Sequence, residues 1–267
     1  MDLVHIFLLF LAGAAAGFLA GFFGIGGGII IVPILILYFH SIGVSSLVAT
    51  HLALGTSLLV VVFAALSSAP YYVRHGFAVR RAVVLMGAAS IIGAFVGSSI
   101  AAMLSGKYLQ QFFAVVVAVA AVRMFVRSKV KDEDLEPDLR FPGLIVTGLS
   151  TGAVSALTGV GGGIFWIPIM HNMLKFPFKK AIGTSSATIV ITAAAGCVGY
   201  VVRGWGDPLL PSSTLGFVDY LHAAPLILGT IPMGRIGAIA ARSTRVNRLR
   251  IIFGVFLLVI VVRMLLF

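Results

Sequence analysis

Charged side chains are scarce in this sequence: they make up 10% of its 267 residues, whereas apolar residues make up 60%. A soluble globular domain carries about 25% charged and about 45–50% apolar residues. A water-soluble core of this size could not bury so much apolar surface. The composition therefore excludes a soluble enzyme and a nucleic-acid-binding protein, and it predicts a polytopic membrane protein with the lipid bilayer as its surroundings.

Cysteine and acidic residues are also few. Cys197 is the one cysteine, so it cannot form an internal disulfide. Because it lies in an apolar run, it is expected to be a small buried hydrophobic residue. Cys/His spacings typical of zinc or haem sites do not occur, so we expect no metal and no cofactor. Five of the eight acids lie between positions 132 and 138, and the others belong near the outer membrane face: Asp2, Asp207 and Asp219.

One pattern occurs twice along the chain. Residues 21–35 read GFFGIGGGIIIVPIL, and residues 156–170 read ALTGVGGGIFWIPIM, so the glycines and the proline recur 135 positions later. Downstream, a Gly-Thr-Ser sequence occurs at 55–57 and again at 183–185. These matches predict a duplication, with a first transmembrane repeat at 1–126, a charged cytoplasmic linker at 127–141 and a second transmembrane repeat at 142–267.

Ten apolar segments are long enough to be helical, which predicts an all-α fold. Most approach the roughly 20 residues that a membrane span needs. The two that follow the glycine clusters have 11 residues each, about 16 Å of helix at 1.5 Å per residue, and are expected to be half-helices. The segments are 3–22, 29–39, 45–69, 81–104, 108–126, 142–157, 164–174, 181–202, 220–241 and 249–267.

The distribution of basic residues predicts the orientation. If every segment changes side, 16 of the 19 Lys and Arg residues share one side, and only Lys107, Arg203 and Arg263 lie opposite. The positive-inside rule makes the basic side cytoplasmic. We therefore expect a multi-pass inner (plasma) membrane protein with both termini outside.

Each repeat contains five segments, an odd number, so the second repeat is expected to be inverted relative to the first, as in many secondary transporters. The parity is the same if each glycine-centred pair of segments is a re-entrant hairpin. The prediction is thus eight to ten membrane segments, with two glycine-broken or re-entrant half-helices.

The two glycine clusters are the main candidate for a binding site. Backbone leaves the helix at membrane depth only where protein or a water-filled cavity satisfies its polar groups. The N-terminus of a half-helix presents unpaired amides and about half a positive charge, and glycine lets a ligand approach them closely. We expect a positive pocket without charged side chains, suited to a small anionic substrate. The alternative is that these glycines only allow close helix packing. The glycines concerned are Gly26, Gly27, Gly28, Gly161, Gly162 and Gly163.

Hydroxyl groups that recur in both repeats are expected to complete the shell around the ligand: Thr56, Ser57, Thr184 and Ser185. The alternative is that they bond to carbonyls four residues earlier in their own helix. His51 is the one ionisable group near the start of the first Gly-Thr-Ser helix. It is a candidate proton relay, or else a neutral hydrogen-bonded histidine.

The paired glycine-rich segments with their following prolines, Pro33 and Pro168, and the paired Thr-Ser segments resemble those of the sulfite exporter TauE/SafE family, also called the toluene-sulfonate uptake permease family. The resemblance covers nearly the whole chain. It implies a transporter of sulfur-containing organic or inorganic anions such as sulfite or sulfonates. Members of the family differ in substrate and direction.

These observations predict a secondary transporter that moves a small sulfur-containing oxyanion by alternating access around a site near the membrane midplane. Export is favoured, because an anion that leaves a negative interior gains about 2.3 kcal/mol per charge per 100 mV. Accumulation would need a coupling ion, for which no buried acid is evident. An anion channel and an uptake permease with a coupled cation are the alternatives. A membrane-embedded enzyme is not expected, because no nucleophile, acid–base pair or metal cluster is evident within the membrane.

Overall fold

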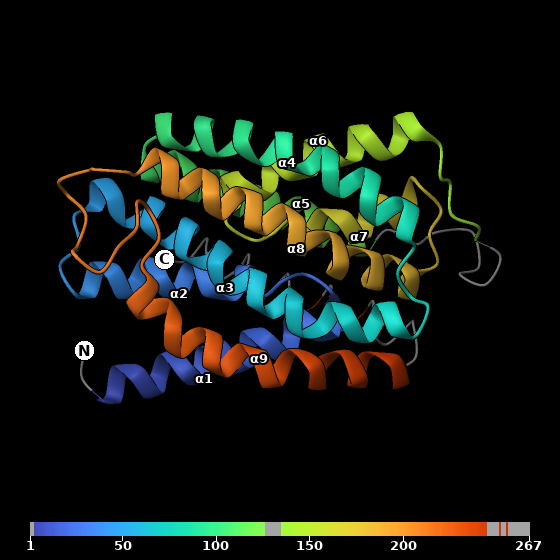
Figure 1. The fold of residues 1–267 in the computed structure, drawn as a ribbon, viewed down its shortest axis with the longest axis horizontal. Coiled ribbons are helices and arrows are strands. Elements are labelled where there is room, and N and C mark those ends of the chain that lie inside the picture. The colour runs from blue at the N-terminus through green and yellow to red at the C-terminus, as the bar shows by residue number, and fades with distance from the viewer. Residues whose placement is uncertain (1–2, 126–134, 245–250, 252–254, 256–267) are drawn as a thin grey trace.

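A computed structural model describes residues 3–125, 135–244, 251 and 255 (Figure 1). Within these residues the chain forms nine α-helices, without strands, in agreement with the predicted all-α fold. Most of the tenth predicted segment and most of the linker lie outside the described residues. The helices are α1 (Leu3–Phe23), α2 (Gly28–Ser41), α3 (Ser46–Arg74), α4 (Arg80–Met103), α5 (Gly106–Phe125), α6 (Phe141–Thr158), α7 (Gly163–Asn172), α8 (Phe178–Arg203) and α9 (Tyr220–Ser243).

Six of these helices are long and apolar enough to cross a membrane, namely α1, α3, α4, α6, α8 and α9. Many large apolar side chains on their outer faces are exposed, among them Phe7 on α1, Val84 on α4 and Leu228 on α9. An exposed apolar surface of this extent is unusual for a soluble protein. The prediction of a polytopic membrane protein is thus confirmed.

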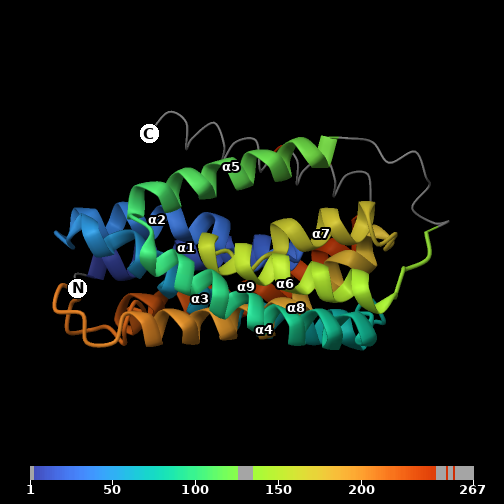
Figure 2. The same ribbon diagram turned by 90° about the horizontal axis from the view of Figure 1, so that it is seen from above.

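Each half of the chain begins with a helical hairpin. The 21-residue α1 is followed by a turn at residues 24–27, the first break, and the 14-residue α2 then returns to the end of the bundle where α1 begins (Figures 1 and 2). The 18-residue α6, a turn at residues 159–162 (the second break) and the 10-residue α7 repeat this arrangement from the opposite end. The described residues therefore agree with the re-entrant form of the prediction. The two half-helices begin one residue earlier than expected.

The two halves pack on each other reciprocally. Helix α1 lies along α9, and α6 lies along α4, so that the first helix of each half contacts the fourth helix of the other. Glycines allow these contacts: a Cβ on Gly13 would lie 2.1 Å from the carbonyl oxygen of Leu226, and one on Gly148 would lie 2.6 Å from that of Met86. This pairing is what a two-fold relation between the halves predicts, and it assigns these glycines to helix packing.

Basic side chains gather at one end of the bundle. Helices α3 and α9 end there, and α4, α6 and α8 begin there (Figures 1 and 2). Among the described residues this end carries Arg74, Arg80, Arg81, Arg140, Lys175, Lys179, Lys180 and Arg242, whereas Lys107 and Arg203 lie at the other end. We call the first of these the basic end.

Candidate functional site

The glycine clusters form the turns within the two hairpins. Gly27 and Gly162 immediately precede α2 and α7 and adopt left-handed backbone conformations, with φ of 80° and 84°. The other positive φ values also match between the breaks: 66° at Gly24 and 83° at Gly26, against 68° at Gly159 and 83° at Gly161. Residues with a Cβ rarely adopt such angles. The local sequence therefore imposes two turns of nearly the same shape.

The two breaks lie against each other in the protein interior. A Cβ on Gly28 would lie 2.6 Å from Cα of Val160, and one on Gly163 would lie 2.2 Å from Cα of Ile25. All six glycines predicted to bind the ligand, at 26–28 and 161–163, are buried. The structure thus brings both clusters together, with their backbones in direct contact.

Two apolar side chains cover the centre of this junction. A Cβ on Gly26 would lie 2.7 Å from Cγ1 of Val61 and 3.3 Å from Cγ2 of Ile189, and a Cβ on Gly161 would lie 2.5 Å and 3.1 Å from the same atoms. Val61 on α3 and Ile189 on α8 therefore each touch both breaks. A ligand that bound both breaks at this point would have to displace these two side chains.

Ser57 and Ser185 connect each Gly-Thr-Ser helix to the break of the other half. The hydroxyl of Ser57 donates a hydrogen bond of 2.8 Å to the carbonyl of Gly159, and that of Ser185 donates one of 2.8 Å to the carbonyl of Gly24. Both serines are fully buried. These bonds run between the halves, not to carbonyls four residues earlier in the same helix.

Thr56 and Thr184 each bind the residue that directly precedes the fourth helix of the other half. The Thr56 hydroxyl accepts the backbone N–H of Asp219, at 2.9 Å, and the Thr184 hydroxyl accepts that of Val79, at 3.0 Å. The glycine before each threonine allows this approach, because a Cβ on Gly55 would lie 2.0 Å from the carbonyl oxygen of Phe217. In this conformation the Gly-Thr-Ser sequences join the two halves.

His51 belongs to α3, and its side chain contacts the C-terminal end of α4. Its Nε2 is 3.0 Å from the carbonyl oxygen of Ala101 and 3.1 Å from that of Leu104, so Nε2 carries a proton and donates to the helix end. Its Nδ1 is buried without a hydrogen-bond partner in the described residues. The contacts of Nε2 agree with the alternative that His51 is a hydrogen-bonded histidine. The proton-relay role stays a prediction.

Asp219 is a structurally important acid that the sequence placed only near the outer face. The structure buries it completely at the start of α9, where its carboxylate accepts hydrogen bonds from the N–H groups of Leu221 and His222. It also lies 2.6 Å from Nδ1 of His222. An aspartate directly before an apolar helix is a typical N-cap, and this sequence signal could have indicated its role.

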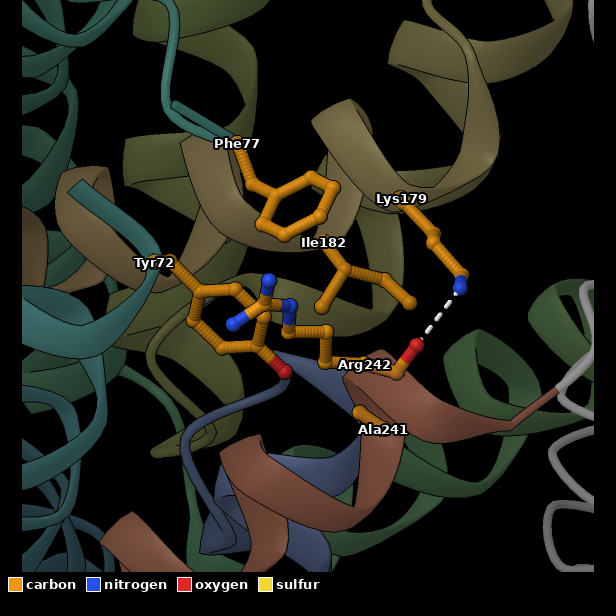
Figure 3. A pocket seen from close by; sticks show the side chains of 6 residues that line it. All are labelled: Tyr72, Phe77, Lys179, Ile182, Ala241 and Arg242. Atoms are coloured by element: carbon orange, nitrogen blue, oxygen red, sulfur yellow. Dashed lines mark hydrogen bonds between the residues drawn. The ribbon is translucent and has the colours of Figure 1, made fainter. Parts of the chain in front are cut away.

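A small cavity lies between the first break and the basic end (Figure 3). Its volume of about 10 Å³ is close to that needed for one water molecule. Lys179 donates a hydrogen bond of 2.7 Å to the carbonyl of Arg242, and both side chains line the cavity. Ile182 also lines it, and its carbonyl oxygen would lie 2.6 Å from a Cβ on Gly24. Two cations therefore stand beside a constricted space that adjoins the first break.

Comparison with known proteins relates this architecture to a family. The sulfite exporter TauE/SafE family matches residues 9–264. A Haemophilus influenzae protein is 32% identical over 260 residues, covering 97% of each chain. A Methanocaldococcus jannaschii protein, MJ0441, is 28% identical over 92% of this chain and 90% of its own. A Bacillus subtilis protein, YdhB, is 25% identical over 83% and 84%.

All three relatives are described as probable membrane transporter proteins. No solved structure gave a significant match. The predicted resemblance is confirmed, and this chain belongs to the sulfite exporter TauE/SafE family of membrane transporters.

Proposed function

We propose that this protein is a secondary transporter, and not an enzyme, that carries a small sulfur-containing oxyanion such as sulfite or a sulfonate across the inner membrane. The ligand binds at the glycine breaks, with Gly26–28, Gly161–163 and the Thr-Ser pairs around it. Access alternates between the two membrane faces. The family's description names sulfite export, and the geometry of the breaks supports an anion as the ligand.

The observation that carries this proposal is the meeting of two half-helix N-termini inside the bundle. The first amides of α2 and α7 have no acceptor in their own helix, and each helix places a partial positive charge at this end. The residues that touch the breaks are glycines, apolar residues, hydroxyl-bearing residues and Trp166. Such a site supplies hydrogen-bond donors and positive potential without a fixed full charge, which suits an ion that must also be released.

The charge distribution supports an orientation for transport. By the positive-inside rule the basic end faces the cytoplasm, with the linker 127–141 inside and both termini outside. Lys179 and Arg242 beside the small cavity would then attract anions from the cytoplasm. Since the membrane potential favours anion exit, export needs no coupling ion, whereas uptake would need one.

The closed junction favours a carrier over a channel. The breaks touch each other, and Val61 and Ile189 cover their centre. The cavity toward the basic end has a volume of only about 10 Å³. A channel needs a continuous open path, whereas a carrier passes through closed conformations in each cycle. Transport by a carrier would require at least one of these contacts to open and re-form.

The test is flux through the purified protein in liposomes. Sulfite, methanesulfonate, sulfate and acetate would each be loaded at the same concentration. We expect saturable flux and counterflow for sulfite or methanesulfonate, slow enough for a conformational cycle. Flux that rises linearly with concentration and shows no counterflow would establish a channel. Absence of flux for all four anions would refute the proposal.

The orientation has a separate test. In a Cys197→Ala background, single cysteines at positions 107 and 207 should react with an impermeant thiol reagent added to intact cells. A cysteine at position 133 should react only after the membrane is opened. The opposite pattern would overturn the proposed topology while leaving the binding site unaffected.

A further inference from the structure

Three buried polar side chains surround the N-terminus of α7. A Cβ on Gly162 would lie 2.9 Å from Nε1 of Trp166, 2.9 Å from Cγ2 of Thr151 and 3.3 Å from Cβ of Ser155. Thr151 and Ser155 are four residues apart on α6, so they lie on the same face of that helix. Trp166 belongs to the first turn of α7. We call these three residues the Thr151–Ser155–Trp166 cluster.

None of the three polar groups has a hydrogen-bond partner anywhere in the described chain: Thr151 Oγ1, Ser155 Oγ and Trp166 Nε1. The residues are 1%, 0% and 0% exposed, so water at the protein surface does not satisfy them. Buried polar side chains almost always have a partner. Three unsatisfied groups at one place, next to a helix N-terminus, indicate a site that is completed by a ligand.

The cluster offers hydrogen-bond donors. The tryptophan Nε1–H is a donor only, and each hydroxyl can donate. The first backbone bonds back to the Gly162 carbonyl come from Phe165 and Trp166, so the amides of Gly163 and Ile164 have no acceptor within α7. A partner with several acceptor oxygens and no proton to donate would satisfy these groups together. An oxyanion has this chemistry, and a metal cation does not.

The first break provides a comparison within the same molecule. The positions that correspond to Thr151, Ser155 and Trp166 after subtraction of the 135-residue repeat distance are all apolar: Ala16, Ala20 and Ile31. There, a Cβ on Gly27 would lie 2.7 Å from the carbonyl oxygen of Ala16 and 3.3 Å from Cβ of Ala20. Because the two breaks have nearly the same backbone angles, the turn itself does not require polar neighbours. The polarity of the second break has another cause.

We infer that the transported oxyanion binds at the second break alone, held by the Thr151–Ser155–Trp166 cluster and the first amides of α7. This inference rests on the proposed transport function and replaces the site shared by both breaks with a narrower one at the second break. The first break supplies the matching turn and the contact surface, and it does not contact the ligand. The space beside Gly162 is too small even for a methyl group. The ligand therefore enters as α6 and α7 move apart, and this movement is part of the transport cycle.

Trp166 allows binding to be measured without transport. The chain has two tryptophans, and the other, Trp205, is 69% exposed. In a Trp205→Phe background the fluorescence therefore reports on Trp166. Sulfite and methanesulfonate, each titrated into the purified protein, should change this fluorescence saturably. Loss of one donor to a charged ligand should weaken binding about 10- to 100-fold, so Ser155→Ala and Thr151→Val should each raise Kd by this factor and slow flux in liposomes.

Thermal stability separates ligand binding from a structural role. Because the two hydroxyls have no partner within the described residues, Ser155→Ala and Thr151→Val should leave the Tm unchanged or raise it. Ser150→Ala is the matched control, since Ser150 lies on the same helix, is exposed and bonds to the carbonyl of Val146. It should bind and transport as the unmodified protein does.

The outcomes distinguish this inference from the proposed function. Unchanged Kd and flux in Ser155→Ala and Thr151→Val, together with unchanged flux in Trp166→Phe, in a protein that transports sulfite or methanesulfonate, would overturn the single-break site and leave the transporter proposal standing. A lowered Tm in the two hydroxyl variants would also overturn it, since the groups would then be structural. If the unmodified protein neither binds nor transports any anion in the panel, the proposed function fails and this inference fails with it.

Discussion

The hydrogen bonds from Ser57 and Ser185 to the opposite breaks allow a quantitative test of the two-fold junction. Ser57→Ala and Ser185→Ala each remove a donor and leave a buried carbonyl, that of Gly159 or Gly24, without its partner. Hydrogen bonds between membrane helices contribute about 0.6 kcal/mol on average and up to about 1.7 kcal/mol. A buried group left without a partner costs about 1–3 kcal/mol. We therefore expect each variant to lose about 1–2 kcal/mol.

For a chain of this size, 1 kcal/mol corresponds to about 2–4 °C in Tm, so each variant should melt about 2–8 °C lower. Both bonds are 2.8 Å long and both serines are fully buried, so the two losses should be nearly equal. The assay is thermal unfolding in detergent, with Ser150→Ala as the hydroxyl-deletion control.

Two results would refute this reasoning. Unchanged Tm in both variants would show that the bonds do not stabilise the junction. A loss in one variant alone would show that the halves are not equivalent there. If the serines instead contact the ligand, as the sequence predicts, the Tm increase produced by added sulfite would disappear in the variants.

Three further predictions concern the breaks and the two ends of the bundle. Gly27→Leu and Gly162→Leu place a side chain at φ values of 80° and 84° and against close neighbours. Membrane insertion should persist, and flux in liposomes should be abolished. Normal flux in both variants would refute the pocket. Asp219→Ala removes the N-cap of α9, which should cost about 0.5–2 kcal/mol and lower the Tm; an unchanged melting curve would contradict this role. Lys179→Ala should raise the KM for sulfite several-fold at low salt and less at high salt, whereas Lys107→Ala should not; equal effects would exclude attraction of anions at the basic end.

The fold could be predicted from the sequence where the signal is local and strong. Segment lengths and apolar content predicted the membrane helices, and the clusters around Gly27 and Gly162 predicted the two half-helices to within a few residues at their ends. The choice between a hairpin and two crossings could not be made, because both give the same charge distribution. It depends on where α2 and α7 return, which is a tertiary property.

The candidate site was predicted less completely, for a physical reason. The sequence singled out Thr56, Ser57, Thr184 and Ser185 because they recur in both halves. The structure shows their hydroxyls bonded to the opposite half. Which hydroxyls have partners depends on packing between the halves, and repetition alone does not reveal it. For a ligand bound at only one of the two breaks, recurrence in both repeats is not the informative signal. The informative signal is a polar residue in one repeat where the other repeat has an apolar residue.

The most direct test of a bound oxyanion is an anomalous difference map from crystals of the full chain soaked in selenite, which has the shape and charge of sulfite and carries a strong anomalous scatterer. We predict one peak inside the bundle, beside Gly162 and within hydrogen-bond distance of Trp166 Nε1. A peak at Gly27, or no peak inside the bundle at a selenite concentration that saturates transport, would contradict the account.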